Sequence, residues 1–219
     1  MKRLILFDFD STIFYLFKDL DRTDLINKLN STLKKYGIND IVDRNFFNCF
    51  LYAKDNLNCL KEINDIITNI EIKRIDEGSI IDGFLDLIYL LKNKYKIGVV
   101  SNNSMECFNK FKEKYLNEYN IPFFGRIENN PDLMKPNPYL IDEAISYFNI
   151  SKEDVIYIGD NVSDYIAANK AGISFIGFGE IERKYIAFKE LNKDFPIVKN
   201  YLELKEYLIW QNLKRWKKD

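Results

Sequence analysis

Two aspartates separated by one residue follow a short apolar run near the start of the chain. Asp8 and Asp10 come directly after Leu4-Ile5-Leu6-Phe7, and such a run is typical of a strand buried on both faces, as in parallel sheets covered by helices. Residues two apart on an extended chain point to the same side, so both carboxylates can face one point beyond the strand, where open parallel sheets bind ligands. The same pattern also fits a strand that enters a turn, with Asp10 or Ser11 as a simple cap.

The absence of histidine restricts the chemistry that the chain can perform. With none in 219 residues, Ser-His-Asp hydrolases, Cys-His enzymes, His-ligated zinc sites and phosphohistidine chemistry are excluded. The sequence has no Walker phosphate loop and no Cys-x5-Arg loop. Its three cysteines, at positions 49, 59 and 107, are far apart, which favours reduced thiols over disulfides or a zinc site. Carboxylates that act with a metal remain among the common hydrolytic devices.

Composition gives little indication of a macromolecular partner. The chain has 32 basic and 33 acidic residues, so we expect neither nucleic acid nor an anionic membrane as a partner. No apolar run approaches the roughly 18 residues that cross a bilayer, and Asp8 interrupts the first apolar run too early for a signal peptide. These features predict a cytoplasmic protein, and the sequence leaves its oligomeric state open.

Residues 15–81 carry apolar side chains at helical spacing. Three stripes predict a small all-helical domain, whose first helix should end at Gly37; they are Leu25, Ile26, Leu29 and Leu33, then Phe46, Phe47, Phe50 and Leu51, then Leu57, Leu60, Ile63, Ile67 and Ile70. Three arginines of this segment could bind an anionic leaving group, although exposed ion pairs are the commoner role, namely Arg22, Arg44 and Arg74.

From residue 82 onward, apolar strands alternate with helical patterns. The alternation predicts an α/β fold, a Rossmann-like open parallel sheet with helices on both faces, formed by residues 1–14 and 82–219. The strands expected after the first are 97–100, 123–127, 155–158, 173–178 and 197–198. The expected helices are 84–91, 105–115, one with Asn137 as N-cap and Pro138 in its first turn, one capped by Ser163 or Asp164 and closed by Gly172, and 202–213.

Three of the predicted strands end in polar clusters. Asp8 and Asp10 follow the first, Ser101 and Asn102 follow the second, and Asp160 and Asp164 follow a third, while Lys135 lies in a loop between the last two clusters. Because the carboxyl ends of parallel strands lie along one edge of a sheet, these groups can meet in one crevice. Taken singly, Ser101 fits a turn, Lys135 a surface lysine and Asp164 a helix cap.

Four segments together resemble the signatures of the haloacid dehalogenase superfamily, in the expected order. They are Asp8-Phe9-Asp10-Ser11-Thr12, Ser101 after an apolar strand, Lys135 before Pro136, and Gly159-Asp160-Asn161-Val162-Ser163-Asp164. The helical segment 15–81 resembles the cap inserted after the first motif in phosphoglycolate-phosphatase-like members. Ser11 stands where many capped members have glycine, although phosphoserine-phosphatase-like members also carry serine there. Ile13-Phe14-Tyr15-Leu16 departs from the usual continuation of capped members, so the resemblance implies no particular substrate.

The residue types suit metal-assisted cleavage of a phosphate ester. A carboxylate that attacks a phosphate needs a divalent metal and fixed cations to offset charge repulsion. Asp8 is the expected nucleophile, which would form an aspartyl-phosphate. Asp8, Asp160 and the backbone carbonyl of Asp10 would hold Mg²⁺, with Asp164 acting directly or through water.

The remaining residues have roles in proton transfer and phosphate binding. Asp10 would protonate the leaving oxygen and later accept a proton from the attacking water. Ser101 and the amide of Asn102 would bind phosphate oxygens, and Lys135 would offset charge on both phosphate and Asp8. The sequence therefore predicts a Mg²⁺-dependent phosphatase that acts on a small phosphorylated metabolite.

Other functions remain compatible with the same residues. Asp10 disfavours the halide-removing branch of the superfamily, which this chain resembles but which needs no acid at that position. A phosphomutase would form the same phosphoenzyme and differ only in where the phosphoryl group goes. A non-catalytic binding protein that kept the fold is the third alternative.

Overall fold

A six-stranded parallel sheet forms the centre of the molecule. The computed structural model describes residues 3–43 and 45–216, with side chains as far as residue 209. In that part of the chain the strands lie in the order β3-β2-β1-β4-β5-β6, and all their pairings are parallel. Their bounds are β1 Leu4–Phe7, β2 Lys96–Val100, β3 Phe123–Phe124, β4 Val155–Gly159, β5 Ser174–Phe178 and β6 Ile197–Val198. The predicted Rossmann-like sheet is confirmed.

Strand β1 lies in the middle of the sheet, at the point where the strand order reverses. It pairs with β2 on one side and with β4 on the other. The chain runs outward from β1 through β2 and β3, then returns to β4 and continues through β5 and β6. Ligands of open parallel sheets bind at such a reversal, beyond the carboxyl ends of the strands.

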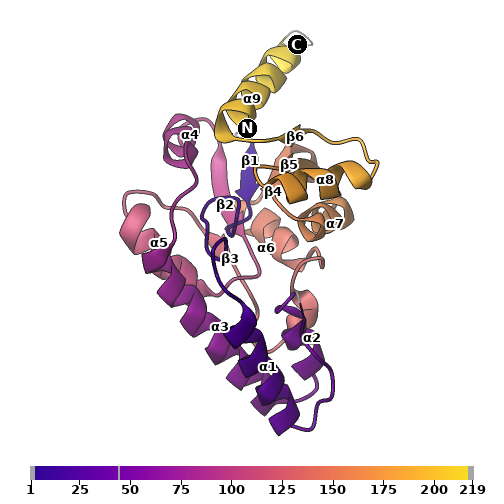
Figure 1. Cartoon of the computed structure of the whole chain (residues 1–219). Helices are drawn as coiled ribbons and strands as arrows, with labels where there is room; N and C mark the ends of the chain where they lie inside the picture. The colour runs from indigo at the N-terminus through magenta and orange to yellow at the C-terminus, as the bar shows by residue number, and fades with distance from the viewer. Residues whose placement is uncertain (1–2, 44, 217–219) are drawn as a thin grey trace.

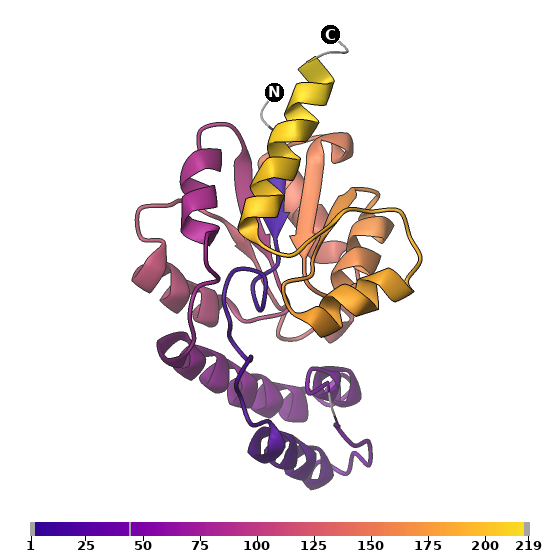
Figure 2. The same cartoon turned by 45° about the horizontal axis from the view of Figure 1, so that its top comes forward.

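Helices cover both faces of the sheet, as predicted (Figures 1 and 2). Ile5 and Phe7 of β1 pack in the apolar core that includes side chains of α4 (Phe84–Leu91), α5 (Met105–Tyr115) and α9 (Tyr201–Trp216). Leu4 and Leu6 point to the other face, against α6 (Tyr139–Phe148) and α7 (Val162–Ala171). This alternation is the side-chain periodicity of a strand buried on both faces.

One helix was not predicted, and one strand and two helix starts differ in detail from the prediction. Helix α8 (Glu182–Glu190) buries only Phe188, so its sequence carries no apolar stripe. Strand β3 ends at Phe124, before the predicted residue 127, because the amide of Arg126 donates instead to the carbonyl of Asn103 (2.9 Å).

The caps of α6 and α7 lie one and two residues, respectively, from the nearest predicted cap. Helix α6 begins at Tyr139, with Pro138 at the N-cap position. Asn137 Oδ1 accepts from the amide of Tyr139 (2.9 Å), two residues on, as a capping side chain does. Asn161 caps α7 and forms a capping box with Asp164 at the third helical position. Asp164 therefore helps to start the helix but is not its cap.

Helices α1 (Thr23–Lys35), α2 (Asn48–Ala53) and α3 (Leu57–Glu77) lie together beyond the carboxyl edge of the sheet (Figures 1 and 2). The first ends just before Gly37, as predicted. Their apolar side chains join the same core as one face of the sheet. Two residues of the predicted stripes, Leu51 and Leu57, are instead 48% and 68% exposed.

The two connections to this helical segment run side by side. Phe14 and Ile80 form an antiparallel bridge, and the amide of Tyr15 donates to the carbonyl of Ser79 (2.9 Å). Gly78 lies so close that a Cβ there would collide with the carbonyl oxygen of Tyr15 and with the Phe14 ring. The helical segment is thus joined to the sheet domain by two connecting segments that lie next to each other.

No helix in the described part of the chain is both long enough and apolar enough to span a membrane.

Candidate active site

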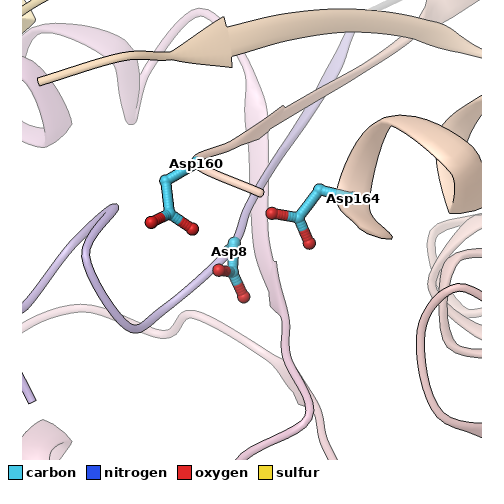
Figure 3. A group of neighbouring side chains, drawn as sticks. All are labelled: Asp8, Asp160 and Asp164. Atoms are coloured by element: carbon cyan, nitrogen blue, oxygen red, sulfur yellow. The ribbon is translucent and has the colours of Figure 1, made fainter. Parts of the chain in front are cut away.

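Three buried aspartates converge at the carboxyl edge of the sheet (Figure 3). Asp8 follows β1, Asp160 follows β4, and Asp164 lies in the first turn of α7. One carboxylate oxygen from each lies within 4.8 Å of the others, although the residues are only 6%, 4% and 0% exposed. Burying three negative charges side by side is costly unless a cation balances them.

Lys135 supplies one of the balancing charges. Its Nζ lies 2.6 Å from Asp8 Oδ1 and 2.6 Å from Asp164 Oδ1, and it also donates to the hydroxyl of Tyr157 (2.8 Å). The lysine is itself buried. One ammonium group thus bridges two of the three carboxylates and fixes the side chain of Asp8.

The pKa values reflect this crowding. Burial, and then the charge of Asp164, raise the pKa of Asp8 to about 6 even though Lys135 acts in the opposite direction. Burial lowers the pKa of Lys135, but the charges of Asp164 and Asp8 outweigh it and the pKa is raised. Lys135 therefore stays charged at neutral pH.

Asp160 is the least satisfied member of the cluster. Lys184 Nζ of α8 lies 3.2 Å from its Oδ2, but this geometry is not a hydrogen bond, and Oδ2 has no hydrogen-bond partner among the described residues. Burial raises the pKa of Asp160 well above its usual value, and Lys184 offsets only part of that rise. An orphaned buried carboxylate oxygen beside two further carboxylates fits a hard divalent cation.

Asp164 has partners on both of its oxygens. Oδ2 accepts from the amide of Asn161 (2.9 Å), while Oδ1 accepts from Lys135 and lies 3.1 Å from the Tyr157 hydroxyl. A Cβ on Gly159 would lie 2.7 Å from the Asp164 Cβ, so only glycine leaves room for this arrangement. Of the three aspartates, Asp164 is the one best placed to orient Lys135.

Asp10 lies at the turn that leaves the sheet. Ser11 has a left-handed backbone (φ 62°), which a non-glycine residue adopts only under constraint. Asp10 Oδ1 accepts from the amides of Leu16 (3.0 Å) and Phe17 (3.4 Å). Burial raises the pKa of Asp10, partly opposed by the bond from Leu16, so this carboxyl retains a proton to higher pH than an ordinary aspartate.

The loop after β2 brings the predicted phosphate ligands to the same crevice. The Ser101 hydroxyl donates to Asn103 Oδ1 (2.8 Å). Asn102 Nδ2 donates to the carbonyl of Lys135 (3.1 Å), and Asn102 Oδ1 accepts from the Lys135 amide (2.8 Å). The side chain of Asn102 thus holds the backbone of Lys135, a role that the sequence did not indicate.

All of the predicted site residues line one crevice of about 430 Å³. A volume of this size suits a small metabolite. The helical segment contributes part of the wall through Asn45, Phe47, Asn48 and Leu51. Lys54, at the end of α2, pairs with Asp132 of the crevice wall, since its Nζ lies 3.2 Å from Asp132 Oδ1.

Arg22 and Arg74 of the helical segment are not among the residues that line the crevice. Arg74 pairs with Glu77 (2.7 Å) and donates to the carbonyl of Leu16, which agrees with an ion-pair role. Arg22 packs over the Phe46 ring at 5.5 Å. Arg44 lies outside the described residues.

The sequence analysis missed two residues of this site. Tyr157 is the one residue of a buried apolar strand that carries a hydroxyl, and it is fully buried. Because a buried tyrosine hydroxyl needs a hydrogen-bond partner, its presence in the sequence could have indicated a polar neighbour. Lys184 gave no signal because α8 was not predicted. Together they add one hydroxyl and one cation to the carboxylate cluster.

Comparison with known proteins agrees with this geometry. The family model for haloacid dehalogenase-like hydrolases matches residues 5–178. The chain belongs to the haloacid dehalogenase-like hydrolases. The match spans the four polar segments and the helical insertion between the first two. No curated protein sequence matches the chain.

Solved haloacid dehalogenase-like structures share the fold at low identity. A hydrolase of this superfamily from Ehrlichia chaffeensis is 24% identical, with 96% of this chain and 98% of that one covered at a TM-score of 0.60. A structure named a haloacid dehalogenase-like hydrolase, from Bacteroides fragilis, is 21% identical, with 93% and 100% covered at 0.65. One named a predicted phosphoglycolate phosphatase, from Haemophilus somnus, is 16% identical, with 94% and 98% covered at 0.64.

Proposed function

We propose that this haloacid dehalogenase-like protein is a Mg²⁺-dependent phosphatase that hydrolyses a small phosphomonoester through an aspartyl-phosphate on Asp8. The observation that carries the proposal is the position of Asp8, which lies at the end of a buried central strand, 2.6 Å from Lys135 and beside two further carboxylates. Several neighbours in the fold are named phosphoglycolate phosphatases, and the crevice is small enough for a phosphorylated metabolite.

The carboxylate cluster has the donor set of a Mg²⁺ site. Asp8, Asp160 and the backbone carbonyl of Asp10 would hold the ion, and Asp164 would reach it through water because protein groups occupy both of its oxygens. The ion would supply positive charge that offsets repulsion between the substrate phosphate and Asp8.

In the first chemical step, a carboxylate oxygen of Asp8 attacks the phosphorus and the bond to the leaving oxygen breaks. Lys135 and the loop after β2 hold the phosphoryl oxygens. Asp10 transfers its proton to the leaving oxygen, for which its raised pKa is suitable. The products of this step are the free alcohol and phospho-Asp8.

In the second step, Asp10 accepts a proton from water as that water attacks the same phosphorus. The bond between phosphorus and the Asp8 oxygen breaks, which releases inorganic phosphate and restores the Asp8 carboxylate. Asp10 thereby returns to its protonated form.

Residues 15–81 would serve as a cap that selects the leaving group. Side chains of the segment 45–51 face the crevice, and the narrow double connection at Phe14 and Ile80 is a suitable hinge. Replacing residues 15–81 with a short linker should leave slow hydrolysis of generic esters but erase preference among metabolites. Unchanged preference in such a folded variant would exclude a selecting role for the cap.

A screen of phosphorylated metabolites for phosphate release tests the proposed function. We expect release from at least one small ester, dependent on added Mg²⁺ and lost in Asp8→Asn. Transfer of the phosphoryl group between two positions of a sugar, without release, would identify a phosphomutase instead. Magnesium binding without turnover of any ester would favour a binding protein.

A further inference from the structure

A second buried ionic cluster lies on the other side of the loop after β2. Arg126, in the turn after β3, pairs with Glu71 of α3: its Nη1 lies 3.0 Å from Glu71 Oε1. The two side chains are 1% and 0% exposed. The pair joins the last third of helix α3 to the turn after β3, a part of the sheet domain that is remote in sequence from both connections.

Arg126 and Glu71 each bind the loop as well as one another. Arg126 Nη1 donates to the carbonyl of Asn102 (3.0 Å). Glu71 accepts from Asn103 Nδ2 (2.9 Å) and from the amide of Ser104 (3.0 Å). Three successive residues of the loop are therefore fixed by this one pair.

The remaining contacts of Arg126 hold it in place. Its Nε donates to Asn64 Oδ1 (2.9 Å) and its Nη2 to Thr68 Oγ1 (2.8 Å), both on α3. The guanidinium also packs over the Phe50 ring at 4.7 Å. A planar fork with five donors is suited to such a set of fixed acceptors, and a lysine is not.

The loop held in this way carries the proposed phosphate ligands. Asn103 Oδ1, on the side chain fixed by Glu71, accepts from the Ser101 hydroxyl (2.8 Å), and the Asn102 side chain holds the backbone of Lys135. A chain of hydrogen bonds thus leads from α3 through the loop to the Ser101 hydroxyl and to the backbone of Lys135. Ligand geometry of this kind depends on the residues that support the ligands.

We propose that Glu71 and Arg126 are positioning residues of the phosphate site, so that helix α3 of the inserted segment sets the geometry of the loop 101–104. The inference rests on the proposed phosphatase function. Neither residue is among those that line the crevice. Their effect passes through Asn102, Asn103 and Ser104.

The test compares Glu71→Gln with Asp76→Asn. Asp76 is a matched control, because it also lies on α3 and pairs with a core helix, through Lys110 of α5 (2.5 Å). Within the described part of the chain, its ion pairs are with α5 and none is with the loop. Titration calorimetry would measure the affinity for inorganic phosphate of each Mg²⁺-loaded protein and, separately, the affinity for Mg²⁺.

Glu71→Gln should weaken phosphate binding by about 10- to 100-fold, the usual cost of altering a residue that supports a ligand from behind. Its Mg²⁺ affinity should remain that of the wild-type protein, since the carboxylate cluster is intact. Asp76→Asn should alter neither affinity. Wild-type phosphate affinity in folded Glu71→Gln would overturn the inference, whereas a wild-type protein that binds no phosphate would remove the proposed function itself.

Two further measurements cover the case in which Glu71→Gln does not fold. The double variant Glu71→Gln/Arg126→Gln leaves no uncompensated buried charge and should show the same loss of phosphate affinity; wild-type affinity would overturn the inference. In the wild-type protein, hydrogen exchange at the Ser104 amide should be as slow as in the strands of the sheet. Fast exchange there would show that Glu71 does not hold the loop.

Discussion

The two buried ionic clusters of this protein differ in how completely their groups are paired. In the Glu71–Arg126 cluster one carboxylate faces one guanidinium, and the surrounding amides and hydroxyl match their hydrogen-bonding groups. In the crevice, Lys135 pairs with Asp8 and Asp164, and Lys184 lies 3.2 Å from Asp160, but an oxygen of Asp160 has no hydrogen-bond partner among the described residues.

The difference separates a cluster that holds structure from one that is prepared for a ligand. A fully paired buried network fixes one conformation. An unbalanced cluster costs free energy until something positive occupies it, and strongly raised carboxyl pKa values are a sign of that cost. The comparison predicts opposite responses to substitution in the two clusters.

Metal removal should have the largest effect. Complete chelation of divalent metal should abolish phosphate release, because the crevice then lacks the positive charge that Asp8 needs to approach a phosphate. Added Ca²⁺ should inhibit, since its larger and more variable coordination shell allows Asp8 to bind through both oxygens. Turnover that survives full chelation would show that the crevice is not a metal-dependent site.

Asp10→Asn should reduce turnover by about 100- to 10,000-fold, the usual contribution of a general acid or base. A substrate with a nitrophenolate leaving group, which needs no proton, should partly recover the first step while the second stays slow. Burst kinetics would separate the two steps. Equal slowing of both steps with the nitrophenyl ester would contradict a proton-transfer role.

Glu71→Gln should lower the free energy of unfolding by about 3–5 kcal/mol, because breaking a buried pair leaves the partner's charge uncompensated. Urea denaturation followed by circular dichroism would measure the change. Asp76→Asn, which breaks an exposed pair, should cost less than about 1 kcal/mol. Similar losses in both variants would place the Glu71 pair in the same class as a surface ion pair.

Protonation of Asp8 should stabilise the folded protein, whereas protonation of an aspartate in an ordinary ion pair destabilises it. Its pKa in the folded protein is about 6, against 3.8 for an ordinary aspartate, so between these values the folded state holds a proton that the unfolded state lacks. The metal-free protein should therefore gain on the order of 2 kcal/mol from this group as the pH falls from about 6 to about 4. Asp8→Asn should lack this gain, and identical pH profiles of the two proteins would exclude it.

Asp160→Asn should have the smallest effect on the free energy of unfolding, and it should raise that free energy where Glu71→Gln lowers it. Removing one buried negative charge from the unbalanced cluster should stabilise the metal-free protein by about 0.5–2 kcal/mol, while it weakens Mg²⁺ binding. Asp142→Asn, which alters an exposed pair with Lys152, is the control. Destabilisation by Asp160→Asn would mean that the crevice is balanced without a cation.

The sequence predicted the parts of the molecule that follow from strong local patterns. Buried strands followed by aspartates were found correctly, since continuous apolar runs and their polar ends are visible in the sequence. The meeting of Asp8, Lys135, Asp160 and Asp164 followed from the geometry of a parallel sheet.

The rest depended on contacts between segments that no local pattern reveals. Helix α8 has no apolar stripe, so Lys184 could not be placed. Glu71 continues the buried stripe of Leu60, Ile63 and Ile67 on α3, and a charge on that face was a signal of a buried partner. Arg126 could not be identified as the partner, because the turn after β3 meets α3 only in the folded chain and no local sequence pattern indicates that contact.

The most direct test of the account is to locate the phosphoryl group during turnover. Asp10→Asn should accumulate the intermediate, because it retains the nucleophile and loses the base that activates water. Acid quench after mixing with a nitrophenyl ester, followed by peptide mass spectrometry, should find phosphate on Asp8. If the Asp10→Asn variant carries phosphate on a residue other than Asp8, or carries none, the assignment of Asp8 as the nucleophile is contradicted.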